Sequence, residues 1–115
     1  MTTLLHNPRC SKSRATQALL EEAGVAFEVR EYLKDPLSET ELRTLQTQLG
    51  RPPREWVRTG QDEYRAAGLD ANSPEEALLA AMAAHPILME RPIVIHGDAA
   101  RVGRPPHQVL ELFED

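Results

Sequence analysis

Strand patterns occur only near the two ends of this 115-residue chain, and helical patterns fill the middle. Residues 3–6 predict a short strand, residues 11–22 a helix closed by Gly24, and residues 25–30 a second strand of alternating apolar and polar side chains. Residues 93–95 predict a β-branched strand, residues 97–98 a hairpin turn, and residues 100–103 another short strand. Pro105-Pro106 predicts the start of a last helix. The order of elements is therefore β-α-β, a helical segment, and β-β-α.

The terminal helices each present one apolar face, which predicts the side that packs on the sheet. In the first helix the residues expected on this face are Ala15, Ala18, Leu19 and Ala23. In the last helix the residues expected to be buried are Val109, Leu110 and Phe113.

The middle, residues 36–85, contains several helix start and stop signals. Residues 38–41 (Ser-Glu-Thr-Glu) form a capping-box pattern, and Gly50 predicts where that helix ends. Ser73 is the expected N-cap of a later helix, with Pro74 at its first position. We expect an α/β fold in which a thioredoxin-like core carries a helical insertion. Residues 1–115 then form a single domain, with the core at about 1–34 and 86–115 and the insertion at about 35–85.

Composition excludes several classes of function. A net charge of −5 argues against bulk binding to nucleic acid or to an anionic membrane surface. No apolar run approaches the roughly 18 residues that span a bilayer, and no secretion signal is evident, so a cytoplasmic location is expected. The single cysteine excludes an internal disulfide and cysteine-based zinc sites, and the four histidines show no ligand spacing, so no metal is expected.

Cys10 lies at the expected junction between the first strand and the first helix. Free N–H groups at a helix start stabilise a thiolate, and the cations of Arg9, Lys12 and Arg14 lie around the sulfur with no acidic residue before Glu21. His6 and Ser13 are further candidates for tuning the thiol, together with Arg14. The alternatives are that Cys10 is a small buried apolar residue and that His6 is purely structural.

Three arginines elsewhere stand at element boundaries. Arg58 follows a short helical piece, Arg91 precedes Pro92, and Arg104 precedes the helix-starting Pro105. If the fold gathers them around Cys10, they suit a tetrahedral oxyanion, although each taken alone fits a solvated surface arginine. A phosphatase-type loop is excluded because Thr16 stands where it requires arginine, and a Cys-x-x-Cys redox pair is excluded by Ser13.

Three segments together resemble the glutaredoxin-coupled arsenate reductase family: residues 6–14 (HNPRCSKSR), 91–94 (RPIV) and 100–105 (ARVGRP). The similarity continues through residues 56–58 (WVR) and 85–88 (HPIL), so it covers nearly the whole chain. Some members carry a cysteine where this chain has Gly103.

The resemblance implies a thioredoxin-like core with a cis peptide at Pro92. It further implies that Cys10 attacks arsenate while Arg58, Arg91 and Arg104 hold the oxyanion. Glutathione then acts as co-substrate, glutaredoxin restores the thiol, and no cofactor is bound tightly. Two other functions stay open: a glutathione-dependent thiol reductase of another substrate, and a non-enzymatic regulator similar to the Spx type.

Overall fold

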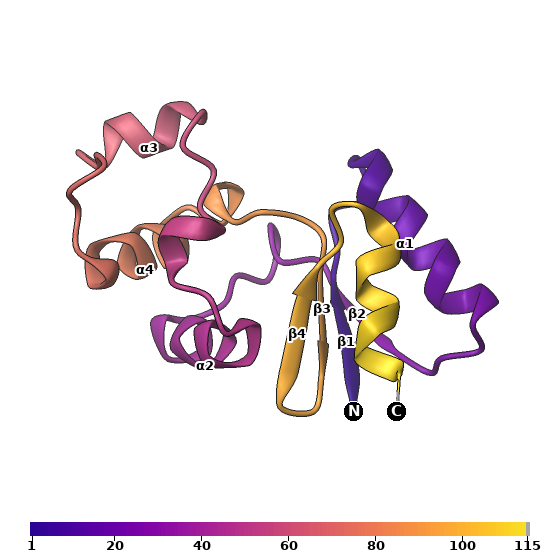
Figure 1. Ribbon diagram of the computed structural model, residues 1–115. Helices are drawn as coiled ribbons and strands as arrows, with labels where there is room; N and C mark the ends of the chain where they lie inside the picture. Colours follow the sequence, from indigo (N-terminus) through magenta and orange to yellow (C-terminus); the bar gives the residue numbers. More distant parts are fainter. Residues whose placement is uncertain (115) are drawn as a thin grey trace. The chain divides into compact units, whose positions relative to one another are not determined.

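The computed structural model describes residues 1–114, which divide into two compact units (Figure 1). The first unit comprises Met1–Asp35 together with residues 91–114, and the second is Pro36–Glu90. The expected insertion ended at residue 85, whereas the second unit continues to Glu90. None of the helices in residues 1–114 has the length and apolar character needed to cross a membrane.

The first unit contains a four-stranded mixed sheet and two helices. The strand order is β2-β1-β3-β4, with β1 parallel to β2 and antiparallel to β3, and β3 antiparallel to β4. This is the thioredoxin-like arrangement that the order of elements predicted. The elements are β1 (Thr2–Leu5), α1 (Ser11–Glu22), β2 (Glu28–Arg30), β3 (Ile93–His96), β4 (Ala99–Val102) and the 3₁₀ helix η3 (Pro106–Phe113).

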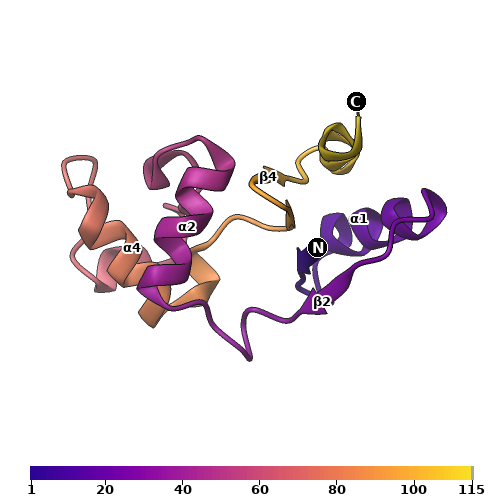
Figure 2. The same cartoon turned by 90° about the horizontal axis from the view of Figure 1, so that it is seen from below.

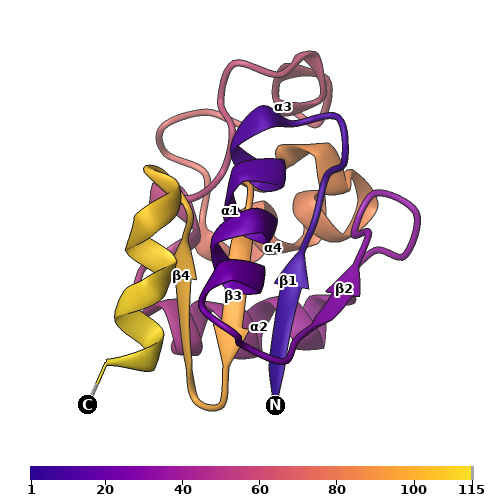
Figure 3. The same ribbon diagram turned by 90° about the vertical axis from the view of Figure 1, so that its right-hand side faces the viewer.

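Helices α1 and η3 cover the same face of the sheet (Figures 1 and 3). Between them and the strands lies a core of fully buried Leu4, Leu20, Val94 and Val109. Because α1 follows β1 directly and η3 follows β4, burying this core fixes both connections at the strand ends.

The strand register brings several connections to the same end of the sheet. Leu5, the last residue of β1, pairs with Ile93, the first of β3, and Ile93 pairs with Val102, the last of β4. Leu5 also pairs with Arg30 at the end of β2. The loop that carries Cys10 therefore meets the segments before β3, after β4 and after β2.

Helix α1 has the predicted bounds, but the face expected to be buried was wrong. Ala15, Ala18 and Ala23 are exposed, whereas Ser13, Thr16 and Leu20 are buried. The hydroxyls of Ser13 and Thr16 can be buried because each has a hydrogen-bond partner. The Ser13 hydroxyl bonds to His6 and to the Asn7 N–H, and the Thr16 hydroxyl donates to the Lys12 carbonyl at 2.9 Å.

Other expected elements are shifted or shorter. Only residues 28–30 of the expected second strand pair, and Val29 is 45% exposed because β2 is an edge strand. The last helix is a 3₁₀ helix in which Val109 is fully buried, while Leu112 and Phe113 pack on the core and Leu110 is half-buried.

The N-cap of α4 is Pro74 and not Ser73, which was the expected N-cap. The hydroxyl of Ser73 accepts the Asp70 N–H instead.

The second unit is helical, as expected. The predicted capping box of Ser38 and Glu41 is formed, and Gly50 ends α2 with a φ of 67° that suits glycine. Helix α2 lies beside α4 (Figure 2), where Gln46 donates to Glu75 at 3.2 Å. The elements are α2 (Glu39–Leu49), the 3₁₀ helix η1 (Pro53–Glu55), α3 (Asp62–Ala66), α4 (Glu75–Ala84) and the 3₁₀ helix η2 (Pro86–Leu88).

Candidate active site

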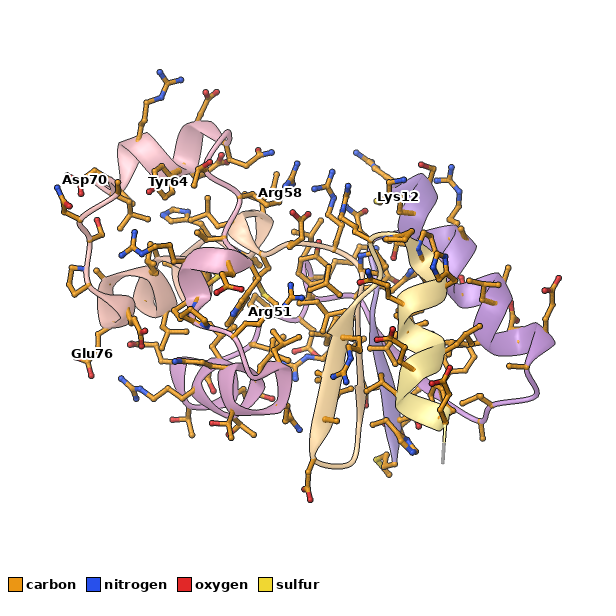
Figure 4. All side chains as sticks on the ribbon, viewed as in Figure 1. Lys12, Arg51, Arg58, Tyr64, Asp70 and Glu76 are labelled. Atoms are coloured by element: carbon orange, nitrogen blue, oxygen red, sulfur yellow. The ribbon has the colours of Figure 1, made fainter. Side chains whose placement is uncertain are left out.

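Cys10 is the N-cap of α1 and its thiol is half-buried. The loop before it is held by its own bonds: the Cys10 N–H donates to the Asn7 carbonyl at 3.0 Å, and the Arg14 guanidinium donates to the Pro8 carbonyl at 2.9 Å. The first turn of α1 contains no acidic residue. In Figure 4 the Lys12 side chain extends outward from this turn.

The pKa of the Cys10 thiol lies below its ordinary value, and five contributions of opposite sign set it. Burial is the largest of them and raises the pKa. It is outweighed by the backbone N–H groups of Ser13 and Lys12 and by the positive charges of Arg91 and Arg104, all of which favour the thiolate. The Cys10 side chain forms no capping hydrogen bond of standard geometry.

Arg91 and Arg104 are joined to each other at the start of β3 and the end of β4. The Nε of Arg104 donates to the Arg91 carbonyl at 2.8 Å, and the Gly103 N–H donates to the Pro92 carbonyl at 2.8 Å. The peptide bonds before Pro92 and before Pro105 are both cis; the resemblance implied the first of these. Arg91 and Arg104 therefore belong to one hydrogen-bonded corner of the sheet, and the charges of both side chains act on Cys10.

Gly103 occupies a position with no room for a side chain. A Cβ there would lie 2.8 Å from the Pro92 Cγ and 2.8 Å from the Thr16 Oγ1. Helix α1 thus approaches the Arg91–Arg104 corner at van der Waals distance, and a side chain at position 103 would require Thr16 or Pro92 to shift. Sequence reasoning did not identify Thr16 or Gly103 as part of the site. A glycine directly before Arg-Pro at a strand end was the available signal.

His6 is buried and hydrogen-bonded through Nδ1 to the Ser13 hydroxyl at 2.6 Å. Burial lowers the pKa of His6; the charge of Glu31 opposes this and the charge of Arg14 adds to it. His6 is therefore favoured in the neutral form at pH 7.

The three residues expected to tune the thiol, His6, Ser13 and Arg14, make different contacts. Ser13 acts on the sulfur through its backbone N–H, while its hydroxyl accepts the Asn7 N–H at 3.0 Å and bonds to His6. Arg14 is bonded to the loop carbonyl of Pro8, and its charge acts on His6. His6 is thus linked to the first turn of α1 through the Ser13 hydroxyl.

Arg58 lies in the second unit (Figure 4). Its N–H donates to the Leu88 carbonyl at 2.7 Å, and its guanidinium donates to the Ile87 carbonyl at 3.3 Å. A bridge between Val57 and Met89 fixes the same segment. The backbone around Arg58 is therefore held within its own unit.

No group of three or more histidine, cysteine or acidic side chains in residues 1–114 could hold a metal ion. The arrangement around Cys10 is instead a nucleophilic sulfur beside two guanidinium groups. This combination suits attack on the central atom of an oxyanion, because planar guanidinium groups bind its oxygens through paired hydrogen bonds.

Known proteins share this sequence and fold along nearly their whole length. The chain is 49% identical over 104 residues to an arsenate reductase of Neisseria meningitidis, covering 89% of each chain. It is 50% identical over 111 residues to the uncharacterised Escherichia coli protein YfgD, covering 95% of this chain and 93% of that one. The solved structure of an arsenate reductase from Vibrio cholerae superimposes with a TM-score of 0.91 at 48% identity, covering 96% of both chains. The model of the ArsC family matches residues 5–112. The chain belongs to the ArsC family, whose fold is thioredoxin-like.

Proposed function

We propose that this protein is an arsenate reductase that uses Cys10 as its nucleophile. The observation that carries the proposal is a half-buried thiol whose pKa is lowered by two helix N–H groups and by Arg91 and Arg104. The names of the relatives from Neisseria meningitidis and Vibrio cholerae support arsenate as the substrate.

In the first step the Cys10 thiolate attacks arsenic. A sulfur–arsenic bond forms, and one arsenate oxygen takes up a proton and leaves as water. Arg91 and Arg104 hold the remaining oxygens, and Arg58 is the third proposed oxyanion ligand. The guanidinium charges serve twice, because they favour the thiolate before attack and the anion during it.

In the second step glutathione supplies the electrons. Its thiolate attacks the Cys10 sulfur, a mixed disulfide forms, and the electron pair of the sulfur–arsenic bond stays on arsenic, which is released as arsenite. Two thiols are thereby oxidised and arsenic is reduced by two electrons. Glutaredoxin then takes the glutathionyl group and frees Cys10. An outside thiol fits this role since Cys10 is the only cysteine of the chain. A thiol that must stay reduced fits a reducing compartment such as the cytoplasm.

The test is arsenite formation from arsenate, glutathione and glutaredoxin by the purified protein. We expect turnover by the wild type and none by Cys10→Ser. Arg91→Lys keeps the charge but loses the planar two-point geometry, so we expect KM for arsenate to rise more than kcat falls. Glutathionylation of Cys10 without arsenite formation would instead favour a thiol reductase of another substrate, and a protein inert in both assays would favour a regulator.

A further inference from the structure

A cavity of about 230 Å³ lies against the loop that carries Cys10. One wall is formed by the loop that includes His6, Pro8 and Arg9, and the other by Glu31, Leu33 and Lys34, which follow β2. Parallel pairing of β1 with β2 places these two walls side by side, because Leu5 pairs with Arg30 at the end of both strands. None of the proposed catalytic steps uses this cavity.

The walls carry two cations and one anion. Arg9 is exposed, and its guanidinium makes no ion pair with the described residues of the chain. Glu31 and Lys34 form an ion pair at 3.6 Å, with Lys34 82% exposed. Pro8 adds an apolar surface, as does Leu33, which is 39% exposed and among the few large exposed apolar side chains in residues 1–114. The cavity is thus suited to a short apolar chain that ends in a carboxylate and an ammonium group.

We propose that this cavity binds the γ-glutamyl end of glutathione. Arg9 and Lys34 face its carboxylate, Glu31 its ammonium group, and Leu33 with Pro8 its methylene groups. The inference rests on the proposed function only in taking glutathione as the thiol that reacts with Cys10.

The dimensions allow the sulfur and the γ-glutamyl end to be bound together. Pro8 lies two residues before Cys10, so their Cα atoms are at most about 7.6 Å apart. The arm from the sulfur of glutathione to its γ-glutamyl α-carbon is roughly two residues of extended chain, about 7 Å. The γ-glutamyl arm of a glutathione bonded to Cys10 is therefore long enough to span the separation between Cys10 and Pro8, which lines the cavity.

The experiment measures how fast Cys10 reacts with two disulfides of equal net charge, glutathione disulfide and N-acetylcysteine disulfide. In either case the Cys10 thiolate attacks one sulfur, a mixed disulfide forms, and the other half leaves as a thiolate. N-acetylcysteine has an acetyl group where glutathione has the γ-glutamyl arm, and a free carboxylate where glutathione has glycine. Because the two disulfides carry equal net charge, general charge attraction cancels in the ratio of the two rates, and the cavity variants then test whether the γ-glutamyl arm causes the preference. Each rate constant is divided by the rate constant of 2-mercaptoethanol with the same disulfide. This normalisation corrects for the different intrinsic reactivities of the two disulfides.

We expect the wild type to prefer glutathione disulfide about tenfold by this normalised ratio. Arg9→Gln and Glu31→Gln should each lower the preference about two- to fivefold, the effect of losing one partly exposed ion pair. Lys12→Gln removes a cation beside Cys10 that does not line the cavity, so it should slow both disulfides alike and leave the ratio unchanged. Arg101 on β4 forms an exposed ion pair with Glu111 of η3, so Arg101→Gln should change neither rate.

A wild-type ratio near one would overturn the proposal, and so would a preference that survives in both Arg9→Gln and Glu31→Gln. A loss of preference in Lys12→Gln as large as that in Arg9→Gln would also overturn it in favour of a diffuse basic surface. The assay contains no arsenate. A protein that prefers glutathione disulfide but forms no arsenite therefore refutes arsenate reduction and retains the glutathione site.

Discussion

Replacing Gly103 by alanine tests whether the close approach of α1 to the arginine corner sets up the site. The added Cβ would lie 2.8 Å from the Pro92 Cγ and the Thr16 Oγ1, closer than folded proteins allow. Both neighbours are held: Thr16 is fully buried and bonded to the Lys12 carbonyl, and Pro92 accepts the Gly103 N–H. Overpacking of this kind costs about 1–3 kcal/mol, which lowers Tm by roughly 4–12 °C for a chain of this size.

The same displacement should reach the sulfur. Gly103 adjoins Arg104, whose Nε is bonded to the Arg91 carbonyl, and both arginine charges lower the pKa of Cys10. Gly103→Ala should therefore raise that pKa. Thermal unfolding followed by circular dichroism measures the first effect, and the pH dependence of Cys10 alkylation by iodoacetamide measures the second.

Gly60→Ala is the matched control. A Cβ at Gly60 meets nothing within 4 Å and its φ is not in the left-handed region, so we expect a change within about 0.5 kcal/mol. Adding Thr16→Ala to Gly103→Ala removes one of the two clashing atoms and should restore part of the lost Tm. The reasoning would be refuted if Gly103→Ala unfolded at the wild-type temperature with an unchanged Cys10 pKa.

Further predictions concern charge, protonation and a helix cap. Arg91→Gln and Arg104→Gln should each raise the pKa of Cys10 and move the alkylation profile to higher pH; an unmoved profile would mean that the guanidinium charges do not act on the sulfur. The pKa of His6 is lowered in the folded state, so the unfolded state binds its proton first as pH falls. His6 therefore supports folding above its unfolded pKa of about 6.5, and this contribution is lost as pH falls through the lower folded value; urea titrations at pH 5 to 8 should show a shallower pH dependence for His6→Asn. Ser38→Ala removes the side-chain half of the α2 capping box and should cost about 0.5–2 kcal/mol in urea unfolding, with no effect on Cys10 alkylation.

Local signals were sufficient to predict much of the fold. Ser38 with Glu41, Gly50 and the hairpin turn at Gly97 each act through a few adjacent residues, and the structure confirms each of them. The insertion was likewise expected to begin at about residue 35, and the second unit begins at Pro36. Such features depend on backbone geometry that nearby side chains dictate.

The buried face of α1 could not be predicted because its burial depends on partners far from the helix. Hydropathy favoured alanines over Ser13 and Thr16, but His6 and the Asn7 N–H satisfy the Ser13 hydroxyl. Thr16 is buried against Gly103, the residue after β4, which has no side chain. Periodicity treats a hydroxyl as polar, whereas a bonded hydroxyl is compatible with burial.

The site likewise contains some residues that the sequence identified and others that only the fold revealed. Charge at a helix start marked Cys10, and arginines before prolines marked Arg91 and Arg104, so the residue types alone identified groups that the fold brings together. Glu31 and Lys34 carried no such signal. They became candidates only once the parallel pairing of β1 and β2 placed them beside the Cys10 loop.

The pairing of β1 with β3 also fixes when the reactive thiol comes into existence during synthesis. Roughly 80 residues separate Cys10 from Arg91, which takes about 4–16 s at translation rates of roughly 5–20 residues per second. Until then β1 lacks its central neighbour, and an isolated helix as short as α1 is marginal in water. The sulfur of a nascent chain therefore lacks both guanidinium charges and a stable helix start, which are the groups that lower its pKa in the folded protein. Because oxidation follows thiolate character, we expect Cys10 of an unfinished chain to be oxidised more slowly than Cys10 of the completed protein.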